Sequence, residues 1–259
     1  MIAPVRPKPR YAFWGGITLA LVAMTAWSAK GVGVDFIGMV CNIGGGKRLL
    51  VESFPPDFGF LPRLFKPFLE TLQIALIGSV IGGILAIPVA VLAARPVSPN
   101  GLVWFLDRNF MNVMRTLPDL FWAMLFATAV GFGPLAGALA LTVFTVAVIS
   151  KLFSESIEAI DTNLPEAICA AGGNWIEMVR FGALPQVWPQ YASYLMYAFE
   201  LNVRSSMVLG LVGAGGLGMI LESQRSNFEY ERVSLIILVV LVAVLAIEQL
   251  SGAIRRRLA

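Results

Sequence analysis

Long apolar segments recur along this chain and constrain its fold more than any other feature of the sequence. A helix that crosses the hydrocarbon core of a bilayer needs about 20 predominantly apolar residues. Of the 259 residues, 58% are hydrophobic and only 14% are charged, and the mean hydropathy is +0.78. A soluble domain carries roughly 25% charged residues. The sequence therefore predicts an all-α polytopic membrane protein.

Six segments are expected to span the membrane, at about residues 13–29, 68–94, 117–132, 134–153, 187–212 and 233–254. The first could instead be a cleaved signal peptide, because Ala26 and Ser28 are small residues before a possible cleavage point. We expect residues 1–66 to form an N-terminal anchor helix and an external connection, and residues 67–259 to form the transmembrane core. Glycines and prolines should break that connection: Gly44, Gly45, Gly46, Pro55, Pro56 and Pro62. Within the core, residues 162–186 are too polar to span and predict a cytoplasmic loop.

The distribution of basic residues predicts the orientation in the membrane. With a cytoplasmic N-terminus, eleven basic residues fall inside and seven outside, and the inside set is densest at the two ends of the chain, at residues 6–10 and 255–257. Cytoplasmic segments carry an excess of lysine and arginine, so both termini are expected in the cytoplasm. On this map Cys41 lies outside and Cys169 inside, which forbids a disulfide between them within one chain.

The residue inventory excludes most soluble enzyme classes. The chain has no histidine and two cysteines, which excludes a histidine-ligated metal, a Ser-His-Asp triad and an all-cysteine zinc site. A net charge of +3 is too small and too dispersed for a nucleic-acid groove. No phosphate-binding P-loop motif occurs, so the chain itself is not expected to bind ATP. We expect no catalytic, cofactor-binding or metal-binding residue here.

Glycines are predicted to serve helix packing and one tight turn. Gly78 and Gly82 form a small-xxx-small pair, the spacing that lets two membrane helices approach closely. A second group, expected at the outer end of the fifth span, comprises Gly213, Gly215, Gly216 and Gly218. Its G-x-G-x-x-G spacing matches a dinucleotide fingerprint, but that motif needs a strand before it in a soluble βαβ unit. A turn that permits close helix packing, or backbone N–H contacts to an anion, is the better interpretation.

The loop at residues 162–186 carries the most specific motif. Glu166, Ala167, Gly172, Leu184 and Pro185 match five of the seven positions of the E-A-A-x3-G-x9-I-x-L-P motif, while Ile168 and Gly182 depart from it. The loop therefore resembles the coupling loop of permease subunits in ATP-binding-cassette importers, which implies a type I importer permease fold.

A short helix that starts after Pro165 would present a smooth surface to a groove on an ATPase subunit, formed by Ala167, Ala170 and Ala171. The alternative interpretation is an amphipathic helix that lies on the membrane surface.

A narrower resemblance points to the phosphonate importer permease. It rests on residues 54–58, 71–75, 199–205 and 210–218 and extends over most of the chain from Phe54 onward. The resemblance implies a symmetric pair of this chain in the bacterial inner membrane, two ATPase subunits that carry ATP and Mg, an external solute-binding protein, and import of a phosphorus oxyanion by alternating access. The alternatives are a permease for another small solute such as an amino acid, and a membrane scaffold that transports nothing.

Polar residues in the fifth span are the candidates for a substrate pathway: Glu200, Asn202, Arg204 and Ser205. Glu200 and Arg204 share one helix face, and Asn202 lies about 160 degrees away from it. A charge inside a bilayer is expensive and normally faces a partner or a cavity. The pair could be an internal ion pair that only fixes packing, or Arg204 could offer a positive wall to a passing phosphonate while Glu200 holds it.

Overall fold

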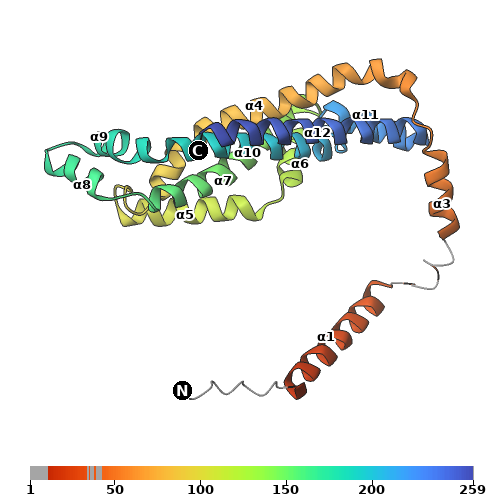
Figure 1. Ribbon diagram of the computed structural model, residues 1–259, viewed down its shortest axis with the longest axis horizontal. Helices are drawn as coiled ribbons and strands as arrows, with labels where there is room; N and C mark the ends of the chain where they lie inside the picture. Colours follow the sequence, from red (N-terminus) through yellow and green to blue (C-terminus); the bar gives the residue numbers. More distant parts are fainter. Residues whose placement is uncertain (1–10, 34, 36–37, 39–42, 259) are drawn as a thin grey trace, which may run out of the picture. The chain divides into compact units, whose positions relative to one another are not determined.

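The computed structural model describes residues 11–33, 35, 38 and 43–258, and every regular element in these residues is helical (Figure 1). The chain divides into two units, Met1–Val51 and Glu52–Ala259. The first unit contains α1 (Tyr11–Val32) and most of α3 (Ile43–Glu52). Gly44, Gly45 and Gly46 lie inside α3, so the expected break at these residues is wrong. Each glycine lowers helix stability by about 1 kcal/mol, but unlike proline it does not forbid helical dihedral angles.

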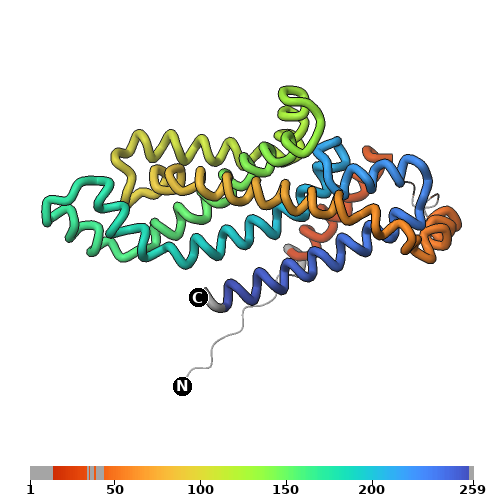
Figure 2. The backbone as a smooth tube through the Cα atoms, turned by 90° about the horizontal axis from the view of Figure 1, so that it is seen from above, coloured from red at the N-terminus to blue at the C-terminus, as the bar shows by residue number. Residues whose placement is uncertain are grey.

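The second unit is a bundle of long helices with short connections. Its elements in chain order are η1 (Phe58–Phe60), α4 (Leu61–Ala93), α5 (Gly101–Thr116), α6 (Asp119–Val130), α7 (Pro134–Glu158), α8 (Asn163–Ala170), α9 (Trp175–Glu177), η2 (Met178–Ala183), α10 (Leu184–Gly210), α11 (Gly216–Ser226) and α12 (Tyr230–Leu258). Figures 1 and 2 show α8 and α9 at one end of this bundle and α11 toward the other. The bundle therefore has two distinct ends, one of which carries the predicted coupling loop.

Three helices of the described residues are long and apolar enough to cross a membrane: Phe58–Ala93, Pro134–Glu158 and Tyr230–Arg256. They correspond to the second, fourth and sixth expected spans. Helix α10 does not meet the same criterion, because the polar residues in its middle lower its hydropathy. Helix α4, which forms the second expected span, begins at Leu61 instead of residue 68. Pro62 is tolerated there because it occupies the first turn, where its missing N–H disrupts no helical hydrogen bond.

The third expected span is short and follows a sharp bend. Residues 117–132 contain only the 12-residue α6, which follows α5 after a bend of 88 degrees, so that α5 and α6 count as one broken span at most. Leu117, immediately before Pro118, has an extended backbone. A residue before proline is disfavoured in the helical conformation, and this restriction ends α5.

The packing of α4 against α7 forms the centre of the bundle. A methyl group added at Gly78 would lie 2.6 Å from Leu141 Cβ, and one added at Gly82 would lie 2.6 Å from Thr145 Cβ. Both distances are shorter than side chains tolerate, so the two helices meet through the bare faces of these glycines. Gly78 and Gly82 therefore lie where α4 and α7 approach each other closely.

Candidate functional site

The predicted coupling helix is present as α8. It begins at Asn163, and the buried Pro165 lies in its first turn with Glu166 directly behind it, where a carboxylate suits the positive end of a helix. Ala167, Ala170 and Ala171 are exposed, as are Glu166 and Gly172. Gly172 ends the helix with φ +90, a conformation that side chains other than glycine rarely adopt. The small-residue face of α8 is therefore open to a partner.

The segment that leads from α8 to α10 explains why Gly182 replaces the isoleucine of the motif. Glu177 and Asn174 form a reciprocal cap, and η2 then leads directly into α10, which begins with Leu184 and Pro185. Gly182 stands where the motif has isoleucine. A Cβ atom at Gly182 would lie 2.9 Å from Pro165 Cα. The close approach of η2 to α8 leaves no room for a side chain at this position.

One hydrogen bond ties the loop to the end of the bundle. The indole Nε1 of Trp175 donates to the carbonyl oxygen of Val97, over 2.6 Å. Val97 is buried and lies in the turn between α4 and α5. This contact was not predicted from the sequence, because nothing in the spacing relates the two residues.

The polar face of α10 carries a network of four charges instead of a single pair. Glu200 Oε1 accepts from Arg204 over 2.5 Å, as the spacing predicted. On α12, Arg255 lies 3.5 Å from Glu200 Oε2, and Glu248 lies 3.5 Å from Arg204. The Glu200 side chain is 9% exposed, whereas those of Arg204 and Glu248 are 46% and 53% exposed. Glu248 and Arg255 were missed, although they lie about two helical turns apart on one face of α12.

We expected Glu200 and Arg204 in the middle of the fifth span. They flank Asn202, whose partners Ser79 and Thr145 lie near the middle of α4 and α7. The structure sets them beside Glu248 and Arg255, where the apolar stretch of α12 gives way to its basic end. Figures 1 and 2 show that the C-terminal end of α12 lies well short of the end that carries α8 and α9.

Asn202 lies on the opposite face of α10 and is fully buried. Its Nδ2 donates to Ser79 Oγ over 2.8 Å and to Thr145 Oγ1 over 2.7 Å, which joins α10 to α4 and α7. Its Oδ1 atom is also buried and accepts no hydrogen bond within the described residues. These contacts give Asn202 a role in packing α10 against α4 and α7. Arg204, in contrast, is about half exposed. Ser205, the remaining pathway candidate, is half-buried.

The glycine-rich segment after α10 forms the predicted tight turn. Gly213, Gly215 and Gly216 have φ values of +86, +85 and +71. The external loop expected after it is instead the helix α11, which contains Gly218. A Cβ atom at Gly210 would lie 2.6 Å from Gly218 Cα, so α10 and α11 meet closely. The N–H of Leu217 donates to the buried Thr71 hydroxyl over 2.8 Å, so the turn also contacts α4. The segment serves packing.

Comparison with known proteins places this architecture among transport proteins. Residues 86–259 match the family of the binding-protein-dependent transport system inner membrane component. The phosphite transport system permease protein PtxC of Stutzerimonas stutzeri is 38% identical over 93% of this chain and 86% of its own length. The putative phosphite transport system permease protein HtxC of the same organism is 37% identical over 97% and 88%. The phosphate-import permease protein PhnE of Mycolicibacterium smegmatis is 38% identical over 81% of this chain and 40% of that protein.

Solved structures show the same fold at lower sequence identity. The methionine transporter MetNI in an inward-facing conformation matches with a TM-score of 0.69 at 24% identity, over 78% of this chain and 99% of that chain. An amino acid ABC transporter matches with a TM-score of 0.63 at 20% identity, over 86% and 99%. The predicted type I importer permease fold is confirmed. This chain belongs to the family of binding-protein-dependent transport system inner membrane components, the permease subunits of ATP-binding-cassette importers.

Proposed function

We propose that this chain is the permease of an ATP-driven importer of phosphonate or a related phosphorus oxyanion, and that it moves its substrate inward by alternating access. The observation that carries the proposal is the exposed α8 surface at the end of the bundle, which has the form expected for an ATPase contact. The similarity to phosphite and phosphate permeases supports the substrate class. The exposed guanidinium of Arg204 offers the positive charge that such an anion requires.

We infer that two copies of this chain enclose the pathway. Arg204 and Glu248 are about half exposed, Glu248 lies within the apolar helix Tyr230–Arg256, and charges facing lipid are strongly unfavourable. A second copy would cover this surface and leave a water-filled route between the chains. Two ATPase subunits, which carry ATP and Mg, would bind the two α8 surfaces, and an external solute-binding protein would deliver the substrate. The permease itself would contribute no catalytic residue.

ATP-dependent uptake of radiolabelled phosphonate, phosphite and phosphate tests the proposed function. Proteoliposomes should contain this chain, the ATPase and the binding protein encoded beside it. We expect accumulation of at least one phosphorus oxyanion that requires both ATP and the binding protein. Uptake of methionine or another amino acid instead would establish a permease of different specificity. A complex that forms but transports nothing would support the scaffold alternative.

Substitutions in the coupling loop should separate ATP hydrolysis from uptake. We expect Glu166→Lys and Gly172→Val to leave membrane insertion intact but to abolish uptake or release the ATPase. The matched control is Gly131→Val at the end of α6. Gly131 has φ +91 and Gly172 has φ +90, with no atom within 4 Å of either Cβ position, so the backbone strain is equal. Equal loss of uptake in both valine variants would show that strain explains the effect and that the loop is not the coupling element.

The proposed orientation places both termini and α8 in the cytoplasm. Cys169 on α8 is exposed and provides a native probe, because the chain has only one other cysteine. In a Cys41→Ser background, an impermeant maleimide should modify Cys169 only after cells are permeabilised. A Cys41→Ser/Cys169→Ser chain with Arg225→Cys on α11 should react in intact cells. Modification of Cys169 in intact cells would reverse the orientation.

A further inference from the structure

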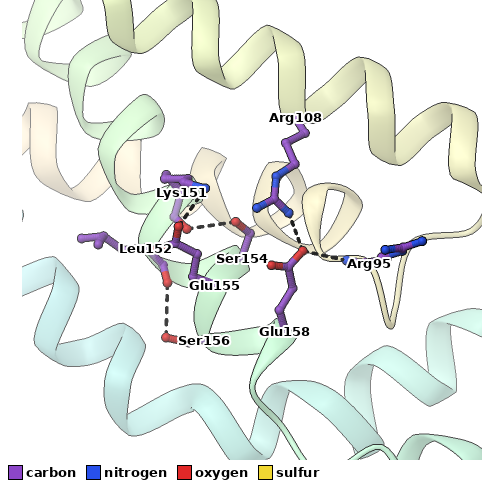
Figure 3. Close-up of polar contacts among 8 residues, drawn as sticks. All are labelled: Arg95, Arg108, Lys151, Leu152, Ser154, Glu155, Ser156 and Glu158. Atoms are coloured by element: carbon purple, nitrogen blue, oxygen red, sulfur yellow. Dashed lines mark hydrogen bonds and ion pairs between the residues drawn. The ribbon is translucent and has the colours of Figure 1, made fainter.

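A second charged site lies where α4 and α7 end, apart from the network on α10. In Figure 3 the Arg108 side chain points at the Glu158 carboxylate, and Arg95 meets it through its backbone N–H while its side chain extends away from Glu158. The guanidinium carbon of each arginine lies 5.6 Å from the centroid of the Trp104 ring. An open cavity is lined by Arg95, Pro96, Trp104, Arg108 and Glu158. We call this cavity the Trp104 site.

The Trp104 site has more positive than negative charge. Glu158 Oε1 accepts from Arg108 Nη1 over 2.5 Å and from the backbone N–H of Arg95 over 3.3 Å. The exposed Arg95 guanidinium has no acidic partner within the described part of the chain. Nearby, Lys151 and Glu155 pair with each other at 2.7 Å, which leaves Glu155 unavailable to Arg95. One carboxylate therefore balances two guanidinium groups in the cavity.

The site also lies at a membrane boundary. The apolar helices α4 and α7 end at Ala93 and Glu158, beside the cavity. Helix α5, which supplies Trp104 and Arg108, exposes large apolar side chains: Leu102, Phe105, Leu106, Phe110 and Val113. Tryptophan and arginine at the end of apolar spans are typical of the headgroup level of a bilayer, and basic pockets between helices there bind anionic headgroups.

We propose that the Trp104 site binds a phosphate-type or phosphonate-type oxyanion between Arg95 and Arg108, and that Glu158 occupies Arg108 when the site is empty. A guanidinium group presents paired N–H donors that match the oxygens of such an anion. The anion would displace the Glu158 carboxylate from Arg108. Because Glu158 is the last residue of α7 and a short turn leads from it to α8, occupancy of the site would be communicated to the coupling loop.

Two sources supply this ligand chemistry. One is the phosphate of an anionic phospholipid, which the membrane level of the site would present directly. The other is free phosphorus oxyanion at the inner face, and only this second source rests on the proposed function. Phosphatidylglycerol and inorganic phosphate represent the two sources in the experiment.

The test uses the assembled transporter in nanodiscs of neutral phosphatidylcholine. The affinity for phosphatidylglycerol is measured by native mass spectrometry after titration with lipid, and that for inorganic phosphate by calorimetry. Arg95→Gln should weaken binding of the responsible ligand about tenfold, the usual effect of losing one charged hydrogen bond. Glu158→Gln should strengthen it, because the internal competitor is removed. Arg115→Gln, a charge loss at an exposed position of α5 outside the cavity, should change neither affinity.

Each result decides the proposal. Weaker binding of phosphatidylglycerol in Arg95→Gln identifies a lipid site, and weaker binding of phosphate identifies a site for the free anion. If Arg95→Gln resembles Arg115→Gln with both ligands, the Trp104 site does not bind an oxyanion. Unchanged affinities in Glu158→Gln would overturn the competition between Glu158 and the ligand. Arg95 forms no ion pair within the described residues, so Arg95→Gln leaves no acidic side chain without its partner. The affinities are measured without transport, so a failure of the proteoliposome uptake test would not change this result.

Discussion

Replacing Gly82 with leucine should abolish assembly of the permease. The Cβ position at Gly82 lies 2.6 Å from Thr145 Cβ and 2.8 Å from the carbonyl oxygen of Thr142, so a larger residue would force α4 and α7 apart. Overpacking of a tight interface typically costs about 1 to 3 kcal/mol or more, a large share of a total stability of about 5 to 15 kcal/mol. The amount of monodisperse complex recovered by size-exclusion chromatography measures the effect.

The matched control for Gly82 is Gly252 on α12. No atom lies within 4 Å of a Cβ atom built at Gly252. Gly252→Leu should therefore be recovered at the level of the unsubstituted protein, and Gly82→Ala should fall between the two. Normal recovery of Gly82→Leu would mean that the interface between α4 and α7 is looser than the structure shows.

Removing the charge of Glu200 should damage the protein far more than removing that of Glu248. Glu200 is nearly buried and holds two guanidinium groups, from Arg204 and Arg255, whereas Glu248 is largely exposed and has one distant partner. Removing one member of a fully buried ion pair costs about 3 to 5 kcal/mol, and the cost here is smaller because Arg204 and Arg255 are 46% and 35% exposed. Glu200→Gln should lower the melting temperature and abolish uptake, and Glu248→Gln should change the melting temperature little. Similar losses in both would contradict the buried role of Glu200.

A double variant then separates architecture from transport. Glu200→Gln/Arg204→Gln removes one charge of each sign, so it should recover much of the folding that Glu200→Gln loses. If Arg204 contacts the substrate, uptake per assembled complex should stay low in the double variant and also in Arg204→Lys, since lysine lacks the guanidinium fork. Full uptake in the double variant would leave the charge network with a structural role alone.

Local patterns predicted those features that depend on neighbouring residues in the chain. The spacing of Gly78 and Gly82 indicated a close helix contact, the sequence around Pro165 indicated α8, and the four-residue spacing of Glu200 and Arg204 indicated their pair. In each case the physical cause lies within one or two helical turns. The resemblance to the importer motif supplied the coupling role that is proposed for the loop.

Contacts between residues that lie far apart in the chain could not be predicted from the sequence. Arg255 meets Glu200, and Trp175 meets Val97, only because the fold brings separate helices together. The bend between α5 and α6, by contrast, has a local cause. Pro118 restricts Leu117 to an extended backbone, and the third span was expected to begin at this point.

The length of α10 allows a displacement at one of its ends to be transmitted to the other. It runs unbroken from Leu184, at the coupling loop, to Gly210, at the glycine turn. At 1.5 Å per residue, its 27 residues form a lever arm of about 40 Å. Asn202 anchors this helix to α4 and α7 and divides it into an arm of about 27 Å toward the loop and an arm of about 12 Å toward the glycine turn. With Asn202 as the pivot, a displacement of the loop would be reversed in direction and reduced about twofold at the far end of the helix.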